Sequence, residues 1–66
     1  MVRLGKPIGS KDGYGVWEEI ERSNGSTVVV GFVVIDPHGK TVGHTATSRE
    51  AWSMLAHELN SRPRAP

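Results

Sequence analysis

Eight consecutive residues without a polar side chain, VVVGFVVI at 28–35, constrain the fold of this chain more than any other feature. The run is far shorter than the roughly 20 residues that span a bilayer, and it has the length of a strand. Alternate residues of a strand face opposite sides of a sheet, so both sides of this strand are apolar. The run therefore predicts a strand that needs cover on two faces.

Turn signals lie on both sides of the run. Asn24-Gly25 is a strong hairpin signal, because both central residues of a type I′ turn need a positive φ. It links the run to YGVWEEIERS at 14–23, which we therefore expect to be a strand, although EEIER favours a helix. DPHG at 36–39 fits a type I turn with a G1 bulge and predicts a third strand over 40–46.

The last element is an amphipathic helix. Thr47 and Glu50 have the spacing of a capping box, in which the Thr47 hydroxyl accepts the amide of the third helical residue, Glu50, and the Glu50 carboxylate accepts the amide of the capping residue, Thr47. Asn60 can end the helix, and Pro63 prevents much continuation. One apolar stripe follows from the helical spacing of Ala51, Trp52, Leu55, Ala56 and Leu59.

These elements predict an α+β fold, a three-stranded antiparallel β-meander with one C-terminal α-helix packed on one face (βββα). The predicted domain covers residues 14–60. Residues 1–13 hold three glycines, one proline and scattered bases, and we expect a flexible basic N-terminal arm, with a short edge strand at 2–4 as the alternative. A disordered C-terminal tail is expected over 61–66.

Strand pairing from the two turns places Trp17 opposite Phe32, and Phe32 opposite His44. The short connection into the helix suggests that the helix covers this face, which comprises Trp17, Val28, Val30, Phe32, Val34, Val42, His44 and Ala46. The other face is apolar too and has no second helix to cover it. Exposed apolar patches mark interfaces, so we predict a partner-binding surface at Tyr14, Val16, Ile20, Val29, Val33 and Ile35. The alternative is that the N-terminal arm folds over this face.

Charge is distributed unevenly along the 66 residues, although the net charge is only +1. Residues 12–60 hold seven acids and three bases, a net charge of −4, and the two ends carry the remaining five bases. A sheet that binds nucleic acid would need the reverse. The first predicted strand carries three acids, Glu18, Glu19 and Glu21. We include them in the predicted partner-binding site, as groups that would contact a basic surface of the partner.

No residue pattern predicts catalysis. HGKT at 38–41 lacks the first glycine of a phosphate loop, where Val34 stands, and a strand rather than a helix follows it. His57-Glu58 lacks the second histidine of a metalloprotease helix. We therefore predict no catalytic residue, no metal site, no cofactor and no enzyme activity. With no cysteine and no apolar leader, the expected location is the cytoplasm, away from membranes.

The segment GKTVGHTATSREAWSMLAHEL, a strand followed by a capped helix, carries one resemblance. In topology, residues 14–60 resemble the arm-binding domains of tyrosine integrases, which read DNA with a three-stranded sheet. That resemblance implies a small nucleic-acid-binding module. The predicted strands carry two bases, Arg22 and Lys40, and three glutamates, whereas a DNA-binding sheet needs mostly bases. DNA binding, helped by the basic ends of the chain, is therefore the alternative prediction and not the first.

The whole chain is small and free of cysteine, is acidic in its predicted ordered part, and lacks catalytic residues. In size and character it resembles the small phage-borne inhibitors called anti-CRISPR proteins. The resemblance implies stoichiometric binding to an effector complex of the host cytosol, sometimes through carboxylates that replace nucleic-acid phosphates. The predicted function is therefore a non-enzymatic protein-binding inhibitor. A structural homodimer is a further alternative.

Overall fold

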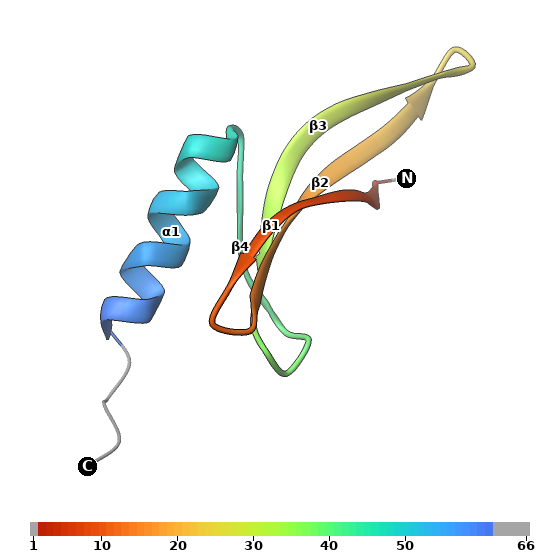
Figure 1. Cartoon of the computed structure of the whole chain (residues 1–66). Coiled ribbons are helices and arrows are strands. Elements are labelled where there is room, and N and C mark those ends of the chain that lie inside the picture. Colours follow the sequence, from red (N-terminus) through yellow and green to blue (C-terminus); the bar gives the residue numbers. More distant parts are fainter. Residues whose placement is uncertain (1, 62–66) are drawn as a thin grey trace.

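The computed structural model describes residues 2–61, which form a four-stranded antiparallel sheet and one helix (Figure 1). The α+β class and the C-terminal helix are confirmed, but the sheet has four strands rather than three. Each strand pairs with the next along the chain, in the order β1-β2-β3-β4. The elements are β1 (Arg3–Lys11), β2 (Tyr14–Ser23), β3 (Ser26–Ile35), β4 (Thr41–Thr45) and α1 (Ser48–Ser61).

The additional strand, β1, lies where a flexible arm over 1–13 was predicted. Asp12 and Gly13 form the turn into β2, with φ of 53° and 85°, which repeats the turn at Asn24 and Gly25 (51° and 79°). Asp-Gly is as clear a hairpin signal as Asn-Gly, so the ordered domain starts before residue 14. At the other end Ser61, expected in the tail, is the last residue of α1, and 62–66 lie outside the described residues.

Glycine and proline do not prevent β1 from pairing, because the strand is irregular and lies at the edge of the sheet. Its register with β2 shifts on both sides of Pro7, and a proline is tolerated where a strand is bulged or its N–H faces solvent. Gly9 has a positive role, since a Cβ there would lie 2.6 Å from the Trp52 ring of α1. Gly9 therefore lets Trp52 pack directly on the backbone of β1.

The register of the sheet agrees with the prediction at the turns and departs from it further along the strands. Ser23 pairs with Ser26, and the Asp36 amide donates to the Lys40 carbonyl at 2.8 Å, as expected. Two bulges then shift the pairing by one residue, at Val30 in β3 and at Val42 in β4. As a result Val33, rather than Phe32, lies opposite both Trp17 and His44.

The shifted register changes which side chains lie under α1. The buried core comprises Tyr14, Val16, Val34, Ala51 and Leu55, with Ile8, Phe32, Val42, Met54 and Leu59 packed against it. The prediction for Phe32, Val34 and Val42 is confirmed. The prediction that Tyr14 and Val16 lie on the uncovered face is wrong, because a one-residue slip exchanges the two faces of a strand.

The N-terminus of α1 is capped by Thr47. The Glu50 amide donates to Thr47 Oγ1 at 3.2 Å, as the sequence predicts, and this first half of the capping box is confirmed. The Glu50 carboxylate differs from the prediction, because it accepts the Thr47 hydroxyl at 3.0 Å instead of reaching an amide. The cap thus joins both side chains and satisfies one amide that the first turn leaves without a helical partner.

Replacing the capping residue should destabilise the domain measurably. Thr47→Ala removes the acceptor for the Glu50 amide, and we expect the free energy of unfolding to fall by about 1 kcal/mol. Urea denaturation followed by circular dichroism would measure the change. Thr47→Ser is the matched control, since it keeps the hydroxyl and should retain most of the stability. Equal losses in both variants would contradict the capping role.

The core occupies only one end of the molecule. Tyr14 and Val34 lie next to the Asp12-Gly13 and DPHG turns, and α1 packs over this end. The rest of the β2–β3 hairpin extends away from α1 toward the Asn24-Gly25 turn (Figure 1). The molecule is accordingly elongated, with extents of 52 × 20 × 16 Å. Within residues 2–61, no helix is long and apolar enough to cross a membrane.

Candidate binding surface

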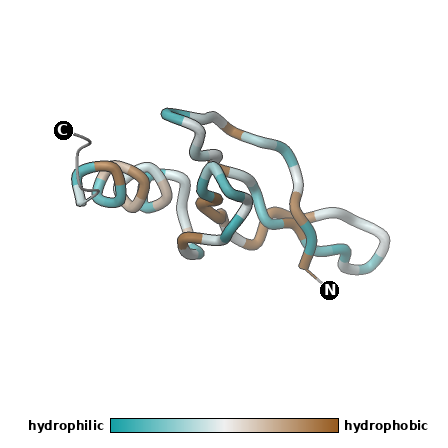
Figure 2. The backbone as a smooth tube through the Cα atoms, turned by 90° about the horizontal axis from the view of Figure 1, so that it is seen from below, coloured by the Kyte–Doolittle hydropathy of each residue, from teal (hydrophilic) through white to brown (hydrophobic). Residues whose placement is uncertain are grey.

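Three consecutive valines in the first half of β3 are exposed. The exposed fractions of Val28, Val29 and Val30 are 44%, 50% and 47%. We call these three residues the valine patch. Val2 and Leu4, which are exposed to a similar degree, lie just before β1 and at its start, and β2 separates β1 from the valine patch. In Figure 2 the hydrophobic colour continues along β3 beyond the part that α1 covers. Such a run of exposed apolar side chains is a candidate interface.

The valine patch also lies on a strand edge without a neighbour. β4 pairs with β3 only over Phe32–Ile35, and the chain then turns away into α1. Over residues 26–31, β3 pairs with β2 on one side and has no partner strand on its other side within the described part of the chain. Alternate backbone N–H and C=O groups of this segment therefore point outward, beside exposed valine side chains.

The six apolar residues predicted to bind a partner do not form one open face. Tyr14 and Val16 are buried under α1, and Val33 is buried on the opposite side of the sheet, with 2% exposed. The position of Val33 explains its burial, because Trp17 and His44 lie opposite it on the two adjoining strands. Ile20 and Ile35 are half-buried, which leaves Val29 as the widely exposed member of the set.

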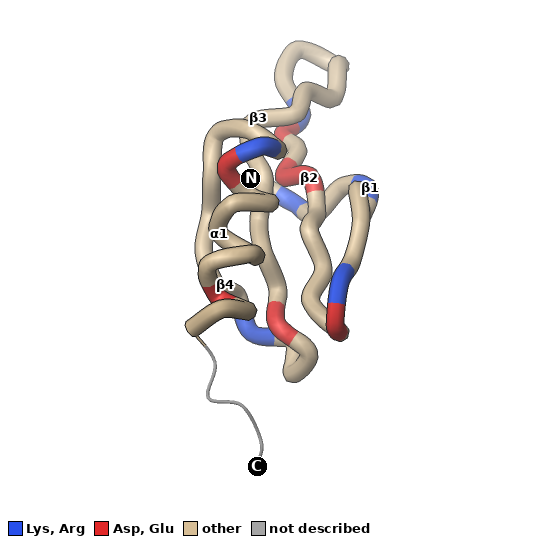
Figure 3. Tube along the Cα trace, turned by 60° about the vertical axis from the view of Figure 1, so that its left-hand side comes forward, with Lys and Arg blue, Asp and Glu red and all other residues tan. Residues whose placement is uncertain are grey.

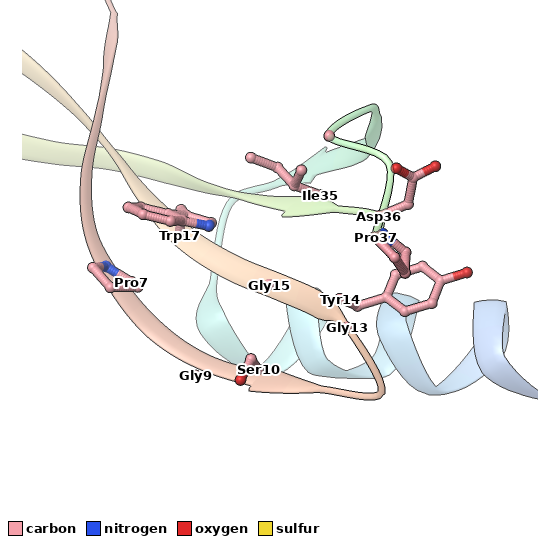
Figure 4. Close-up of a pocket in the computed structure, with 11 residues that line it drawn as sticks. Pro7, Gly9, Ser10, Gly13, Tyr14, Gly15, Trp17, Ile35, Asp36 and Pro37 are labelled. Carbon is pink, nitrogen blue, oxygen red and sulfur yellow. The ribbon is translucent and has the colours of Figure 1, made fainter.

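A shallow hollow of about 440 Å³ lies beside Trp17 (Figure 4). Pro7, Ile35 and Pro37 contribute to its walls, and four glycines keep it open. Gly15 lets the Trp17 ring lie against the strand, since a Cβ there would be 2.9 Å from the indole nitrogen. Asp36 is the only acidic residue in the lining. The hollow therefore offers an apolar contact without a set of converging polar groups.

The Asp36 carboxylate is engaged by its own turn. Its Oδ1 accepts the backbone amides of Lys40 at 2.8 Å and of His38 at 2.9 Å, and the Gly39 amide donates to the Asp36 carbonyl at 3.0 Å. These amides, with that of Lys40 first, hold the pKa of Asp36 below its usual value although desolvation acts against them. Asp36 therefore stabilises the turn through Oδ1.

The lowered pKa predicts how Asp36 contributes to stability as pH changes. A carboxyl whose pKa is lower in the folded state stabilises the fold above its unfolded pKa of about 3.9, and that contribution is lost as pH falls through the folded value. We expect Asp36→Asn to be less stable than wild type at pH 6, with the difference shrinking toward pH 2 to 3. Urea midpoints at several pH values would measure this, with Glu58→Gln, a half-buried carboxyl on α1 away from the turn, as control. A difference independent of pH would contradict the assignment.

The three predicted glutamates lie on β2, an inner strand, where Figure 3 shows acidic positions along the trace. Their side chains do not all lie on one side of the sheet. Glu18 pairs opposite Phe32 and lies on the side of the sheet that α1 covers, whereas Glu19 and Glu21 alternate to the other side. Glu19 Oε1 lies 2.9 Å from His44 Nδ1, on β4. Gly31 lies beside this contact, since a Cβ there would be 3.7 Å from Glu19 Oε1.

Two arginines lie near the valine patch, on the side of the sheet that carries α1 but in the part of the hairpin beyond the helix. A small hollow of about 150 Å³ is lined by Arg3, Ile20, Arg22 and Thr27, and Ile20 pairs with Val29. The sequence reasoning missed this site because it placed Arg3 in a flexible arm. A hairpin turn at Asp12-Gly13 predicts that the preceding residues pair with β2, and this pairing places Arg3 on the sheet. The exposed end of the hairpin thus carries cations on one side and Glu21 on the other.

No arrangement of side chains suited to metal binding is present among residues 2–61. The three histidines lie in a turn, in β4 and in α1, and all are exposed. No family model, curated protein or solved structure matches this chain. The candidate site is therefore defined by its surface chemistry, which is apolar at the valine patch and charged at its borders.

Proposed function

We propose that this chain is a non-enzymatic protein-binding module that acts by occupying a surface of a larger protein. The observation that carries the proposal is the valine patch, three consecutive residues exposed at 44–50% on the two faces of the hairpin, with no covering element among residues 2–61. An isolated exposed valine needs no explanation, but three consecutive exposed valines on both faces of a protruding hairpin favour a partner that contacts the end of the hairpin. The proposal replaces the open sheet face predicted from the sequence with the exposed end of the β2–β3 hairpin.

The charges at the border of the patch indicate the chemistry of the partner. Arg3 and Arg22 flank Ile20 on one side of the hairpin, so that side suits an apolar target surface with acidic residues at its rim. Opposite charges at a rim speed the encounter and are screened by salt. Binding should therefore form faster at low salt, while the valines supply most of the affinity. This differs from the sequence-based expectation of an acidic strand that meets a basic surface.

The proposed consequence of binding is inhibition, by blocking a surface that the target needs. The small size and the resemblance to phage-borne inhibitors support this role, and a host effector complex in the cytosol is the proposed target. A protein of this kind needs no turnover, since one bound copy removes one target. Inhibition should accordingly rise in proportion to the amount of protein added and reach completion near equimolar amounts.

A comparison of three immobilised proteins would test the function. Wild type, Val29→Asp and Ser53→Asp would be exposed to host lysate at low and high salt. Ser53 is an exposed position on α1, remote from the patch, and serves as the control. Because truncating a central interface residue costs 1–2 kcal/mol or more, we expect Val29→Asp to retain at least about tenfold less of the captured protein.

Two results would contradict the proposal. The first is that no protein is retained by wild type, or that all three baits retain the same proteins equally. The second is tight nucleic-acid binding: gel shifts at physiological salt with an affinity well below the nonspecific range of about 10⁻⁴–10⁻⁶ M would favour the alternative module. All three proteins should first be shown to be folded by circular dichroism.

A further inference from the structure

Among residues 2–61 the sheet has three exposed edge segments, and the one on β3 is the least protected against pairing, because a single bulge at Val30 is its one irregularity. The outer edge of β1 carries Arg3, Lys6 and Pro7 and is bulged twice. The outer edge of β4 is only five residues long and follows Lys40. Charges, proline, bulges and short length are the features that keep strand edges from joining. Residues 26–30 of β3, STVVV, have neither a charge nor a proline.

We propose that this edge pairs with the same edge of a second copy of the chain. The two β3 strands would run antiparallel about a two-fold axis perpendicular to the sheet. An axis at Val28 places Val28 opposite its counterpart, Thr27 opposite Val29, and Ser26 opposite Val30. The open segment is then paired along its length, with the bulged Val30 at each end of the contact, and the two sheets become one sheet of eight strands.

Three observations favour a second copy as the occupant. The segment has no charge, so self-pairing brings no like charges together. Its outward backbone groups have no partner strand within residues 2–61, and an antiparallel copy supplies both donors and acceptors. Pairing about Val28 also ends before Gly31, where the Thr45 carbonyl would lie 2.8 Å from a Cβ and β4 already approaches the strand.

The small size of this contact predicts a transient dimer. Five residues on each side bury less than the roughly 1,000 Å² expected of a stable interface, so dissociation should be measurable at micromolar concentrations. Pairing uses the strand edge and leaves the valine side chains on the two faces of the sheet. Dimerisation would therefore bring two valine patches side by side, and it does not depend on the proposed function.

Sedimentation equilibrium from about 1 to 300 μM would test the dimer, a range chosen for an interface below standard size. We expect wild type to move from monomer toward dimer, and Val28→Lys to remain monomeric at every concentration while it stays folded by circular dichroism. The control is Leu4→Lys on β1, with 51% of Leu4 exposed against 44% of Val28, which should dimerise like wild type. A wild type that stays monomeric, or one that forms open-ended oligomers, would overturn the proposal.

Single cysteines would test the position of the axis, because the chain has none of its own. Val28→Cys lies opposite itself in the proposed pairing and should form a disulfide-linked dimer under mild oxidation. Leu4→Cys, equally exposed, should link at least about fivefold more slowly, since directly opposite residues hold their Cβ atoms 4.5–5.5 Å apart. Equal rates would overturn the proposed axis. Failure of both dimer experiments alongside retained target binding would leave the proposed function intact.

Discussion

Val33→Asp should unfold the domain, whereas Val30→Asp on the same strand should leave it folded. Val33 is 2% exposed and Val30 is 47% exposed, so the same substitution meets opposite environments three residues apart. A carboxylate at position 33 would be buried without a partner, and breaking the pairing of a buried charge typically costs about 3–5 kcal/mol. A domain of this size has little more stability than that to lose.

Urea denaturation at pH 7, followed by circular dichroism, would measure both variants. We expect no cooperative transition for Val33→Asp, and for Val30→Asp a free energy of unfolding within about 1 kcal/mol of wild type. Val33→Ala adds a third measurement, because it makes a cavity without a charge and should remain folded but weakened. If Val33→Asp folds with wild-type stability, the sheet face opposite α1 is open, as the sequence first suggests, and a partner must cover it.

Local signals predicted the parts of the fold that depend on a few neighbouring residues. The turns at Asn24-Gly25 and DPHG and the helix cap at Thr47 are confirmed, because positive φ values and side-chain-to-backbone bonds are set by adjacent residues. β1 was missed although Asp12-Gly13 has the same chemistry as the second turn. The glycines of residues 1–13 were interpreted as flexibility, but Gly9 accommodates Trp52.

The bulges could not be predicted from the turns, since their causes lie far along the chain. The bulge at Val42 brings Gly43 under α1, where a Cβ would lie 2.7 Å from Met54 Sδ. A regular strand would instead place a valine side chain opposite Val34. Register is thus decided by helix packing as well as by the turn, and one extra residue on the strand reverses the exposure of every side chain beyond it.

The position of the valine patch follows from element lengths that the sequence does contain. A helix of 14 residues is about 21 Å long at 1.5 Å per residue, and a strand of 10 residues is about 33 Å long at 3.3 Å. A single short helix therefore cannot cover the whole length of the β2–β3 hairpin. Sequence reasoning assigned the uncovered apolar residues to one face, whereas much of the exposed apolar surface lies at one end of the hairpin.

Leu55→Ala should produce the second large loss of stability. Leu55 is 1% exposed and packs in the core with Tyr14, Val16 and Val34. Leucine-to-alanine changes in such sites cost about 2–5 kcal/mol, through lost burial and the cavity left behind. In a domain of 60–100 residues each kcal/mol lowers the thermal midpoint by about 4–8 °C, so we expect a fall of at least about 8 °C. Calorimetry would measure it.

Leu4→Ala is the matched control, since it makes the same chemical change at a side chain that is 51% exposed. Its free energy of unfolding should stay within about 0.5 kcal/mol of wild type. Equal losses at both positions would mean that stability is not concentrated in the core under α1. A large loss at Leu55 alone would place the stability at the end that α1 covers. Val30→Asp tests the valine patch itself, and a small loss of stability there would mean that the fold does not depend on this exposed residue.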